Sequence, residues 1–326
     1  MIRSVLPAGA HDRGATIDAL LAVARRETLV LVVAVGAMDD EGAAVASARL
    51  RWALGSAREM LAASDQAAYR DPRARQLDRI ANCAQRWLVS EPPQPLHEIS
   101  ALVGRVAGVA GHGGRVIAAQ RASLVDLDLD DLDLTRIALY EARLIDVTAR
   151  RARCDAADAR SSRWLRCELE GSSLVKVVLT NSTVEHTELS HANLESTSWH
   201  RAALLHCGLR HVRLVDARLD RAVLSDCSLR GADLSIASCP GAATLSGARF
   251  VRCDLRETNW TGRQLAGATF IDCKLFGAHG SPRLAGVVIE RPDLSLAGDG
   301  SQIGTQAEVV ASWCTMVGAT SAHARV

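Results

Sequence analysis

Residues 212–234 read VRLVDARLDRAVLSDCSLRGADL, and this stretch decides the fold. Every fifth residue in it is leucine, from Leu214 to Leu234. Two places before each leucine stands a small or β-branched apolar residue, while the other three places accept polar side chains. A period of five matches neither an α-helix, with a period of 3.6, nor a β-strand, with a period of 2. The stretch therefore indicates an internal repeat, which determines the architecture before any local propensity does.

The repeat extends far beyond this stretch. Steps of five from Leu124 to Cys239 visit 24 central positions, of which 17 are leucine and none is charged. The positions two places earlier are also uncharged, although the segment is rich in Asp and Arg. After Pro240-Gly241 the phase shifts by one and the pattern resumes at Leu245, with Arg263 as the single charged residue at an expected inward position.

Residues 122–296 resemble the pentapeptide-repeat family, whose unit is roughly Ala-(Asp/Asn)-Leu-X-X. The polar place before the central leucine is Asp or Asn in units such as those of Asp128 and Asn193, but Arg in those of Arg143 and Arg213. The resemblance implies a right-handed quadrilateral β-helix, in which four units form one coil. About 8.5 coils stacked at ~4.8 Å would give a rod roughly 40 Å long.

The physics of such a coil agrees with the pattern. A single coil cannot bury its apolar side chains alone, so neighbouring coils must stack around a common core. We expect that core to contain Leu124, Leu129, Leu134, Leu174, Leu194, Leu204, Leu214, Leu219, Leu224, Leu229, Leu234, Phe250, Leu255, Trp260, Phe270 and Leu275. The core is thin near residues 149–159, where three successive centres are small. We expect the neighbouring Trp164 to compensate; the alternative is a local break of the β-helix.

The segment before the repeat predicts a helical bundle, so the chain as a whole is an α+β multidomain protein. We expect helices from about residue 15, over 43–63, from Pro72 onward and over 97–110, with 111–114 as a linker. The domain boundaries are then 1–115 for the helical domain and linker, 116–297 for the β-helix and 298–326 for the tail. Residues 305–316 of the tail predict a helix that caps the rod or packs against a second subunit.

The helical segment also has a faint likeness to domains found beside bacterial type VI secretion genes. The residues that carry it are RRET at 25–28 and AQRW at 84–87, and both motifs are short. The likeness implies a secretion-associated effector or accessory protein.

Two charged groups at the start of the repeat are candidate interaction surfaces, although a merely solvated face is the favoured interpretation of each. The first predicted coil is acidic and the second is basic. The acidic group comprises Asp126, Asp128, Asp130, Asp131 and Asp133, and the basic group comprises Arg150, Arg151, Arg153, Arg160, Arg163 and Arg166.

Histidine and cysteine recur at the coil spacing of 20 residues. His186 and His206 share one outward column that Asp226 continues, so these three are a candidate metal site. The competing interpretation is an ordinary solvated ladder, and we expect no cofactor. Cys207 and Cys227 also lie one coil apart, which would allow a disulfide, but buried reduced cysteine is the expected state in a cytoplasmic protein.

The sequence lacks the motifs of common enzyme classes, including a Walker loop, G-x-S-x-G and H-E-x-x-H. We therefore expect a non-enzymatic scaffold that binds an unidentified protein partner, with no direct nucleic-acid or membrane binding. The apolar run at 28–38 is too short to span a bilayer, and with no signal peptide this suggests a cytoplasmic protein.

The alternative is a DNA-mimicking protector or inhibitor of DNA gyrase or topoisomerase IV, as some members of the family are. Residues 121–290 hold 22 acidic and 22 basic residues, and this neutrality argues against mimicry unless the charges are segregated by face. The partner could thus be a topoisomerase or a secretion-system component, and a homodimer could form through the C-terminal helix.

Overall fold

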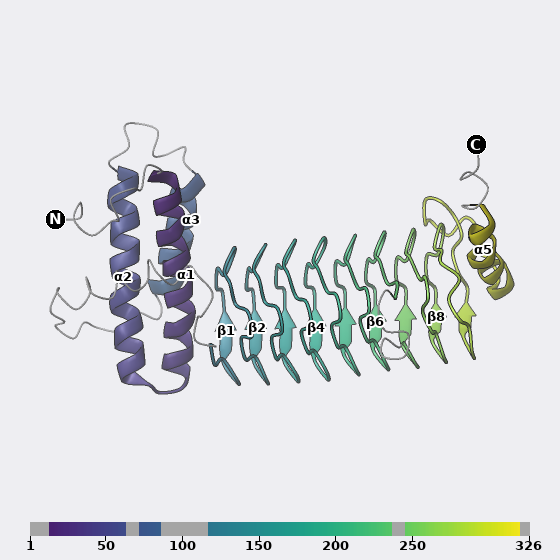
Figure 1. Ribbon diagram of the computed structural model, residues 1–326, viewed down its shortest axis with the longest axis horizontal. Coiled ribbons are helices and arrows are strands. Elements are labelled where there is room, and N and C mark those ends of the chain that lie inside the picture. The colour runs from purple at the N-terminus through teal and green to yellow at the C-terminus, as the bar shows by residue number, and fades with distance from the viewer. Residues whose placement is uncertain (1–12, 63–71, 86–116, 237–244, 320–326) are drawn as a thin grey trace.

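The computed structural model describes residues 13–62, 72–85, 117–236 and 245–319. A helical bundle stands at one end of a long β-helical rod, and a single helix lies at the other end (Figure 1). This arrangement is the α+β architecture that the repeat and the helical patterns predict.

Three helices form the described part of the bundle: α1 (Arg13–Gly36), α2 (Asp40–Ala62) and α3 (Pro72–Gln85). The side chain of Asp39 accepts a hydrogen bond of 2.9 Å from the backbone N–H of Gly42, and this N-cap fixes the start of α2. The helix expected at 97–110 and the linker at 111–114 lie outside the described residues.

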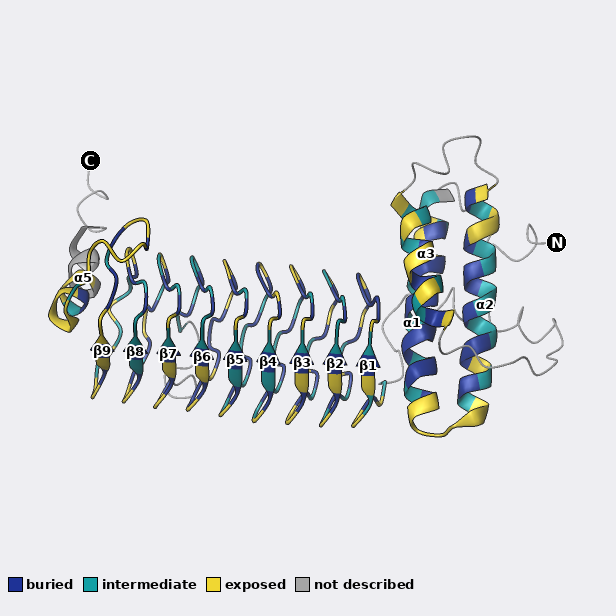
Figure 2. Ribbon diagram, turned by 180° about the vertical axis from the view of Figure 1, so that it is seen from behind, coloured by how far each residue is buried: buried dark blue, intermediate teal, exposed yellow. Residues whose placement is uncertain are grey.

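The rod is a single parallel β-solenoid in which each coil contributes one short strand to a nine-stranded sheet (Figure 2). Partner residues are 20 apart in most coils, for example Leu204 and Leu224. The spacing is 26 between Val223 and Arg249, which places six extra residues at the predicted phase shift, and 19 between Thr269 and Val288. The strands are β1 (Ser123–Val125), β2 (Arg143–Ile145), β3 (Arg163–Leu165), β4 (Thr183–Glu185), β5 (Ala203–Leu205), β6 (Val223–Ser225), β7 (Arg249–Val251), β8 (Thr269–Ile271) and β9 (Val288–Glu290).

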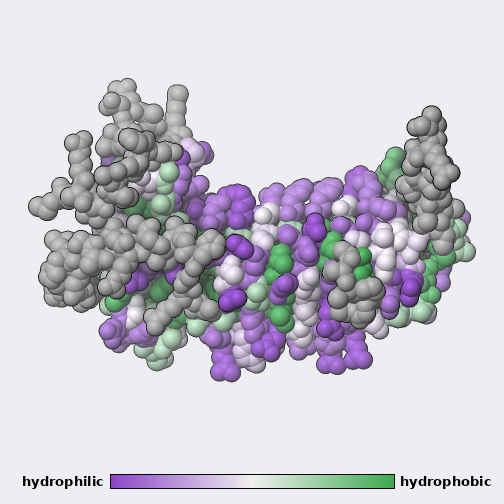
Figure 3. Space-filling view, viewed as in Figure 1, coloured by the Kyte–Doolittle hydropathy of each residue, from purple (hydrophilic) through white to green (hydrophobic). Residues whose placement is uncertain are grey.

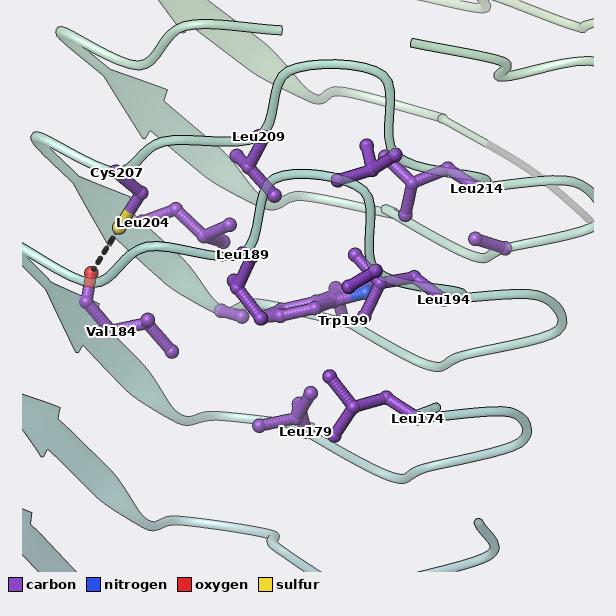
Figure 4. Packing of buried hydrophobic residues seen from close by; sticks show 14 of the residues in the cluster. Leu174, Leu179, Val184, Leu189, Leu194, Trp199, Leu204, Cys207, Leu209 and Leu214 are labelled. Carbon is purple, nitrogen blue, oxygen red and sulfur yellow. Dashed lines mark hydrogen bonds between the residues drawn. The ribbon is translucent and has the colours of Figure 1, made fainter. Parts of the chain in front are cut away.

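Each coil has four sides of five residues. One side forms the strand, and the other three are held to the next coil by single bridges such as Asp128↔Thr148 and Asp133↔Arg153. The central residues of successive coils point inward and stack on one another, as Leu174, Leu194 and Leu214 do in Figure 4. All sixteen residues expected in the core are buried, none with more than 4% of its surface exposed.

The corners of the coils require an unusual backbone. The residue that ends a side adopts positive φ in nearly all units, and most of these residues are not glycine; Asp126, Arg151 and His186 have φ of 54°, 55° and 50°. A left-handed conformation costs roughly 1–2 kcal/mol for a residue with a side chain. Hydrogen bonds to the next coil offset that cost, as when the N–H of Asp126 donates to the carbonyl of Ile145 at 3.0 Å.

The Asp or Asn of the repeat unit has a local role at these corners. The Asp133 carboxylate accepts a hydrogen bond of 3.0 Å from the N–H of Thr135, and Asn193 does the same for Glu195 at 3.1 Å. A short side-chain acceptor two residues before an N–H closes an Asx turn. Arginine at the same place, as in Arg143, offers no acceptor for this turn.

The thin part of the core is filled by Trp164, which is 3% exposed and continues the stack without a break. Its indole N–H donates to the Ser162 hydroxyl at 2.8 Å. An apolar void of about 20 Å³ remains beside it, lined in part by Ala149 and Cys154. The tryptophan therefore replaces most of the missing leucine volume, and the β-helix stays continuous.

The bundle covers the first coil of the rod. Leu29 and Val32 of α1 belong to the same buried cluster as the rod core. Arg25 of α1 forms an ion pair of 2.9 Å with Asp128, and both side chains are buried. The apolar run of α1 thus packs on α2 on one side and on the rod on the other, which explains why the helix is apolar on most of its surface.

The opposite end of the rod is covered by α5 (Gln306–Ala319). Val309 of α5 is fully buried in the rod core. The Gln306 side chain accepts a hydrogen bond from the N–H of Ile289 at 3.1 Å and donates to the carbonyl of Val287 at 3.3 Å. The predicted C-terminal helix therefore caps the exposed edge of the last strand.

Candidate interaction surfaces

The six arginines of the basic group do not form one patch. Because a coil turns through four sides in 20 residues, Arg150 and Arg151 lie on one side, Arg153 on the next, Arg160 on the third, and Arg163 and Arg166 on the strand side. Each one pairs with a carboxylate, and the pairs are Arg150–Glu168, Arg151–Asp131, Arg153–Asp155, Arg160–Asp158, Arg163–Glu185 and Arg166–Asp146.

The acidic group is also dispersed. Asp128 and Asp130 do not lie at the surface, since they are only 7% and 5% exposed, and Asp128 pairs with Arg25 of the docked bundle. Burial raises the pKa of the Asp130 carboxyl, although the N–H of Arg150 donates to it at 2.8 Å. Asp131 pairs with Arg151, and Asp133 closes a turn with Thr135. This group therefore offers little free negative charge to a partner.

Outward corner residues form ladders along the rod. One corner carries the ion pairs Asp146–Arg166 and Asp226–Arg252, each with Nε–Oδ1 distances of 2.6 Å. The two hydrogen bonds from Arg252 hold the pKa of the Asp226 carboxyl well below its usual range, at about 2. Opposite charges one coil apart thus neutralise each other. Figure 3 shows hydrophilic residues along the upper and lower edges of the rod, with apolar residues among those between them.

The histidines stack instead of converging. The rings of His186 and His206 lie face to face, with centroids 4.8 Å apart and planes 7° apart. Asp226, the third candidate ligand, is held by Arg252. In the described part of the chain no three such side chains are arranged to hold a metal ion. The geometry is that of a ladder, and the metal site stays a prediction.

A second stacked pair frames a shallow groove. His191 and His211 have ring centroids 5.3 Å apart at the neighbouring corner. Between the two histidine columns, Gly208 has no side chain, and the Glu188 carboxylate occupies the space where a Cβ would stand. The N–H of Ser190 donates to Glu188 at 2.8 Å, so this carboxylate is already engaged within the chain.

The six described cysteines of the rod are core residues, whereas Cys83 of α3 is partly exposed. Cys207 and Cys227 are buried and free, and the Cys207 thiol donates to the carbonyl of Val184 at 3.3 Å (Figure 4). Burial raises the pKa of the Cys154 thiol to about 12 and contributes most to raising that of Cys167 to about 11. Thiols of this kind are poor nucleophiles at neutral pH. Cys239 lies outside the described residues.

The repeat of the rod matches a known family of sequences. A model of pentapeptide repeats matches residues 204–238 and 243–279 with eight copies. These residues form coils of four five-residue sides with an apolar residue at each centre. The rod is a pentapeptide-repeat β-helix. No curated protein sequence matches the chain.

Solved structures with some similarity to this chain are themselves pentapeptide-repeat proteins. One is HetL, which is involved in heterocyst differentiation regulation in the cyanobacterium Nostoc. The two sequences are 22% identical, the match covers 62% of this chain and 98% of HetL, and the TM-score is 0.35. Another is QnrB1, a plasmid-mediated fluoroquinolone resistance protein. The two sequences are 18% identical, the match covers 60% of this chain and 95% of QnrB1, and the TM-score is 0.31. The assignment of the pentapeptide-repeat fold rests on the repeat match and the coil geometry.

The sequence motifs did not single out the most continuous surface of the pentapeptide-repeat rod, which is the side formed by β1–β9. We call this side the strand face. The residue that ends the strand is aliphatic in six of the nine strands and forms a partly exposed aliphatic ridge: Val125, Ile145, Leu165, Leu205, Val251 and Ile271. Glu185, Ser225 and Glu290 end β4, β6 and β9 and interrupt the ridge. Reading every twentieth residue would have revealed it, because the ridge occupies one outward column of the repeat.

Arginines in two adjacent columns border the ridge. This arginine edge consists of Arg143, Arg163 and Arg249, the first residues of β2, β3 and β7, and of Arg201 and Arg221 at the corner before β5 and β6; all five are exposed. Only Arg163 has a carboxylate partner among the described residues, Glu185 at 3.3 Å. Arg201 and Arg221 occupy the same corner in consecutive coils, so two like charges stand one above the other.

Proposed function

We propose that this protein is a non-enzymatic scaffold whose pentapeptide-repeat rod binds another protein. The observation that supports this role is the strand face, where nine parallel strands in regular register present one continuous outward surface. At ~4.8 Å per strand the face is roughly 38 Å long. It combines partly exposed aliphatic side chains with arginine, a residue type that is enriched at protein interfaces.

The bundle and the rod act as one unit in this proposal. Leu29 and Val32 of α1 are part of the rod core, so the bundle caps the rod as well as extending it. Removing residues 1–115 would expose the first coil, and its unpaired strand edge could then associate with other rods. Binding experiments should therefore use the full chain.

The test is affinity capture from the native lysate with the full-length protein as bait, identified by mass spectrometry. Val223 is 37% exposed on β6, and Val223→Glu should weaken capture of the specific partner. Val175→Glu, at a partly exposed valine on another side of the rod, is the matched control and should retain the partner. Equal capture by both variants would show that the strand face is not the binding surface.

Protection of DNA gyrase or topoisomerase IV remains the alternative outcome of this experiment. It would be supported by enrichment of their subunits together with a dose-dependent effect on supercoiling. The charge pattern does not favour it, because Asp128 and Asp130 are buried and Asp131 pairs with Arg151. Enrichment of secretion components, lost in a secretion mutant, would support the type VI association.

The described residues contain no helix that is long and apolar enough to cross a membrane.

A homodimer through the C-terminal end remains part of the proposal. Leu296 and Ile303 near α5 are 67% and 60% exposed and could pack against a second copy. Light scattering of wild type and Leu296→Glu at several concentrations measures this: a dimer lost only in the variant supports the contact, and a wild-type monomer at all concentrations rejects it.

A further inference from the structure

We propose that the strand face of the rod binds an acidic amphipathic α-helix of the partner, lying along the rod axis. This inference rests on the proposed scaffold function and names the chemistry of the partner. It follows from three properties of the face: its unneutralised charge, its adjacent apolar ridge and the spacing of both.

Several corner ladders of the rod pair opposite charges one coil apart, as in Asp131–Arg151 and Asp272–Arg291. The arginine edge differs from these ladders, although Arg136 and Lys176 on another corner are also exposed cations. Along the arginine edge, Arg143, Arg201, Arg221 and Arg249 have no carboxylate partner among the described residues. The strand face thus keeps a row of positive charge that a row of partner carboxylates would complement.

The stacking of Arg201 and Arg221 strengthens the argument. The N–H of Arg201 donates to the carbonyl of Asp220, next to Arg221 in the chain, so the two residues stand one coil apart. Like charges at such a spacing repel each other unless a counter-charge lies between them or above them. The missing Cβ of Gly247 would lie 3.8 Å from Cγ of Arg221, so this column continues along the rod without an acid in the next coil.

The apolar ridge runs parallel to this charge. Leu165 and Leu205 end β3 and β5, and Val251 and Ile271 end β7 and β8, whereas Glu185 ends β4 and Ser225 ends β6. Glu185 is the partner of Arg163, so it does not neutralise Arg201 or Arg221. Their side chains are partly exposed at the surface of the strands. An amphipathic helix with apolar residues on one stripe and carboxylates on the neighbouring stripe would contact the ridge and the arginine edge at once.

The spacing favours a helix over an extended strand. Coils repeat at ~4.8 Å, and one helical turn advances about 5.4 Å, so each turn can place one apolar and one acidic residue near each coil. In an extended partner strand, side chains on one face repeat at about 6.6 Å, so they lose register with the ~4.8 Å coils after fewer coils than a helix does. The arginine edge from β2 to β7 spans about 24 Å, the length of a helix of about 16 residues.

The experiment is selection of a display library of helical peptides of about 16 residues on the full-length protein. The expected winners carry Asp or Glu on one helical stripe and Leu or Ile on the next. Fluorescence anisotropy of a labelled winner then compares wild type with the double variant Arg201→Glu/Arg221→Glu, for which we expect affinity to fall at least about tenfold. Both arginines are exposed, so circular dichroism should be unchanged.

The matched control is Arg136→Glu/Lys176→Glu, which reverses two exposed corner cations on another corner of the rod and should leave affinity unchanged. Peptides without acidic residues, or winners that bind the double variant equally well, would overturn the inference while the scaffold function stands. Tighter binding of duplex DNA or of phosphatidylserine vesicles, lost in the double variant, would overturn it in favour of those partners. No enriched peptide together with no specifically captured protein would remove both proposals.

Discussion

At the scale of single residues, Arg263 departs most from the repeat. It occupies an inward position that is small or apolar in nearly all other units, and it is fully buried. Its guanidinium donates to the carbonyls of Ala217 and Leu214 at 2.7 and 2.8 Å, and also to that of Leu234. Burial lowers the pKa of Arg263 to about 10, so the side chain stays charged at neutral pH. It joins coils on the two sides of the six-residue insertion.

We expect Arg263→Ala to lower the free energy of unfolding by about 3 kcal/mol. Hydrogen bonds from a charged donor contribute about 1.5–3 kcal/mol, and their loss leaves buried carbonyls without this donor. Urea unfolding followed by circular dichroism measures the change. Arg283→Ala, at an exposed arginine one coil further, should change stability by less than about 0.5 kcal/mol. Similar effects in both variants would show that the buried guanidinium does not hold the insertion.

Trp164 illustrates a second rule at this scale. Each described tryptophan of the rod follows a hydroxyl residue by two places, as in Ser162–Trp164 and Thr197–Trp199, and donates its indole N–H to that hydroxyl. Trp164→Ala should cost about 3–5 kcal/mol, because the surrounding core is already thin. Trp164→Phe should cost less, since it keeps most of the volume. Thermal unfolding of the two variants checks this order, and an equal loss in both would contradict the packing argument.

At the scale of the coil, the sequence predicts the inward positions because burial excludes charge from them, and every one of the sixteen expected core residues is buried. The outward ion pairs could also have been predicted from the repeat. Asp131–Arg151 and Asp146–Arg166 are 20 residues apart, so alignment by coils would have paired them. The basic group looked like a patch because its residues are close in sequence, whereas a coil disperses neighbours around four sides. Asp226–Arg252 spans the insertion and its register is not readable from spacing.

The Asp226–Arg252 pair makes a prediction about pH. The folded pKa of Asp226 is about 2, below the ordinary value of 3.8, so its contribution to stability is present above pH 3.8 and is lost as the pH falls through about 2. The pair is partly exposed, so we expect Asp226→Asn to cost no more than about 1 kcal/mol at pH 7. The difference in melting temperature from wild type should shrink toward zero near pH 2. Glu170→Gln, at an exposed glutamate, should show little difference at either pH. A constant Asp226→Asn effect would reject the role of this ion pair.

At the scale of the whole molecule, the sequence could not reveal that the bundle docks on the rod. The apolar residues of α1 are compatible with a core of the bundle alone, and the acidity of the first coil suggested a solvated surface. Docking buries Asp128 beside Arg25, and the contact depends on two segments that are about 100 residues apart. Pairing across such a distance leaves no periodic signal in either segment. Glu27 of the same helix is also buried, 3.8 Å from Arg49 of α2, and burial raises the pKa of its carboxyl.

The last prediction tests this cap. Leu29 is fully buried in the cluster that contains the rod core, so Leu29→Asp should separate α1 from the first coil. The uncovered strand edge of β1 should then associate with other molecules. We expect concentration-dependent oligomers in size-exclusion chromatography with light scattering, and faster hydrogen exchange at β1 than at β5. Val35→Asp, at a 39% exposed position of the same helix, should leave both measurements unchanged. A Leu29→Asp variant with wild-type size and protection at β1 would show that the rod end is stable without the bundle.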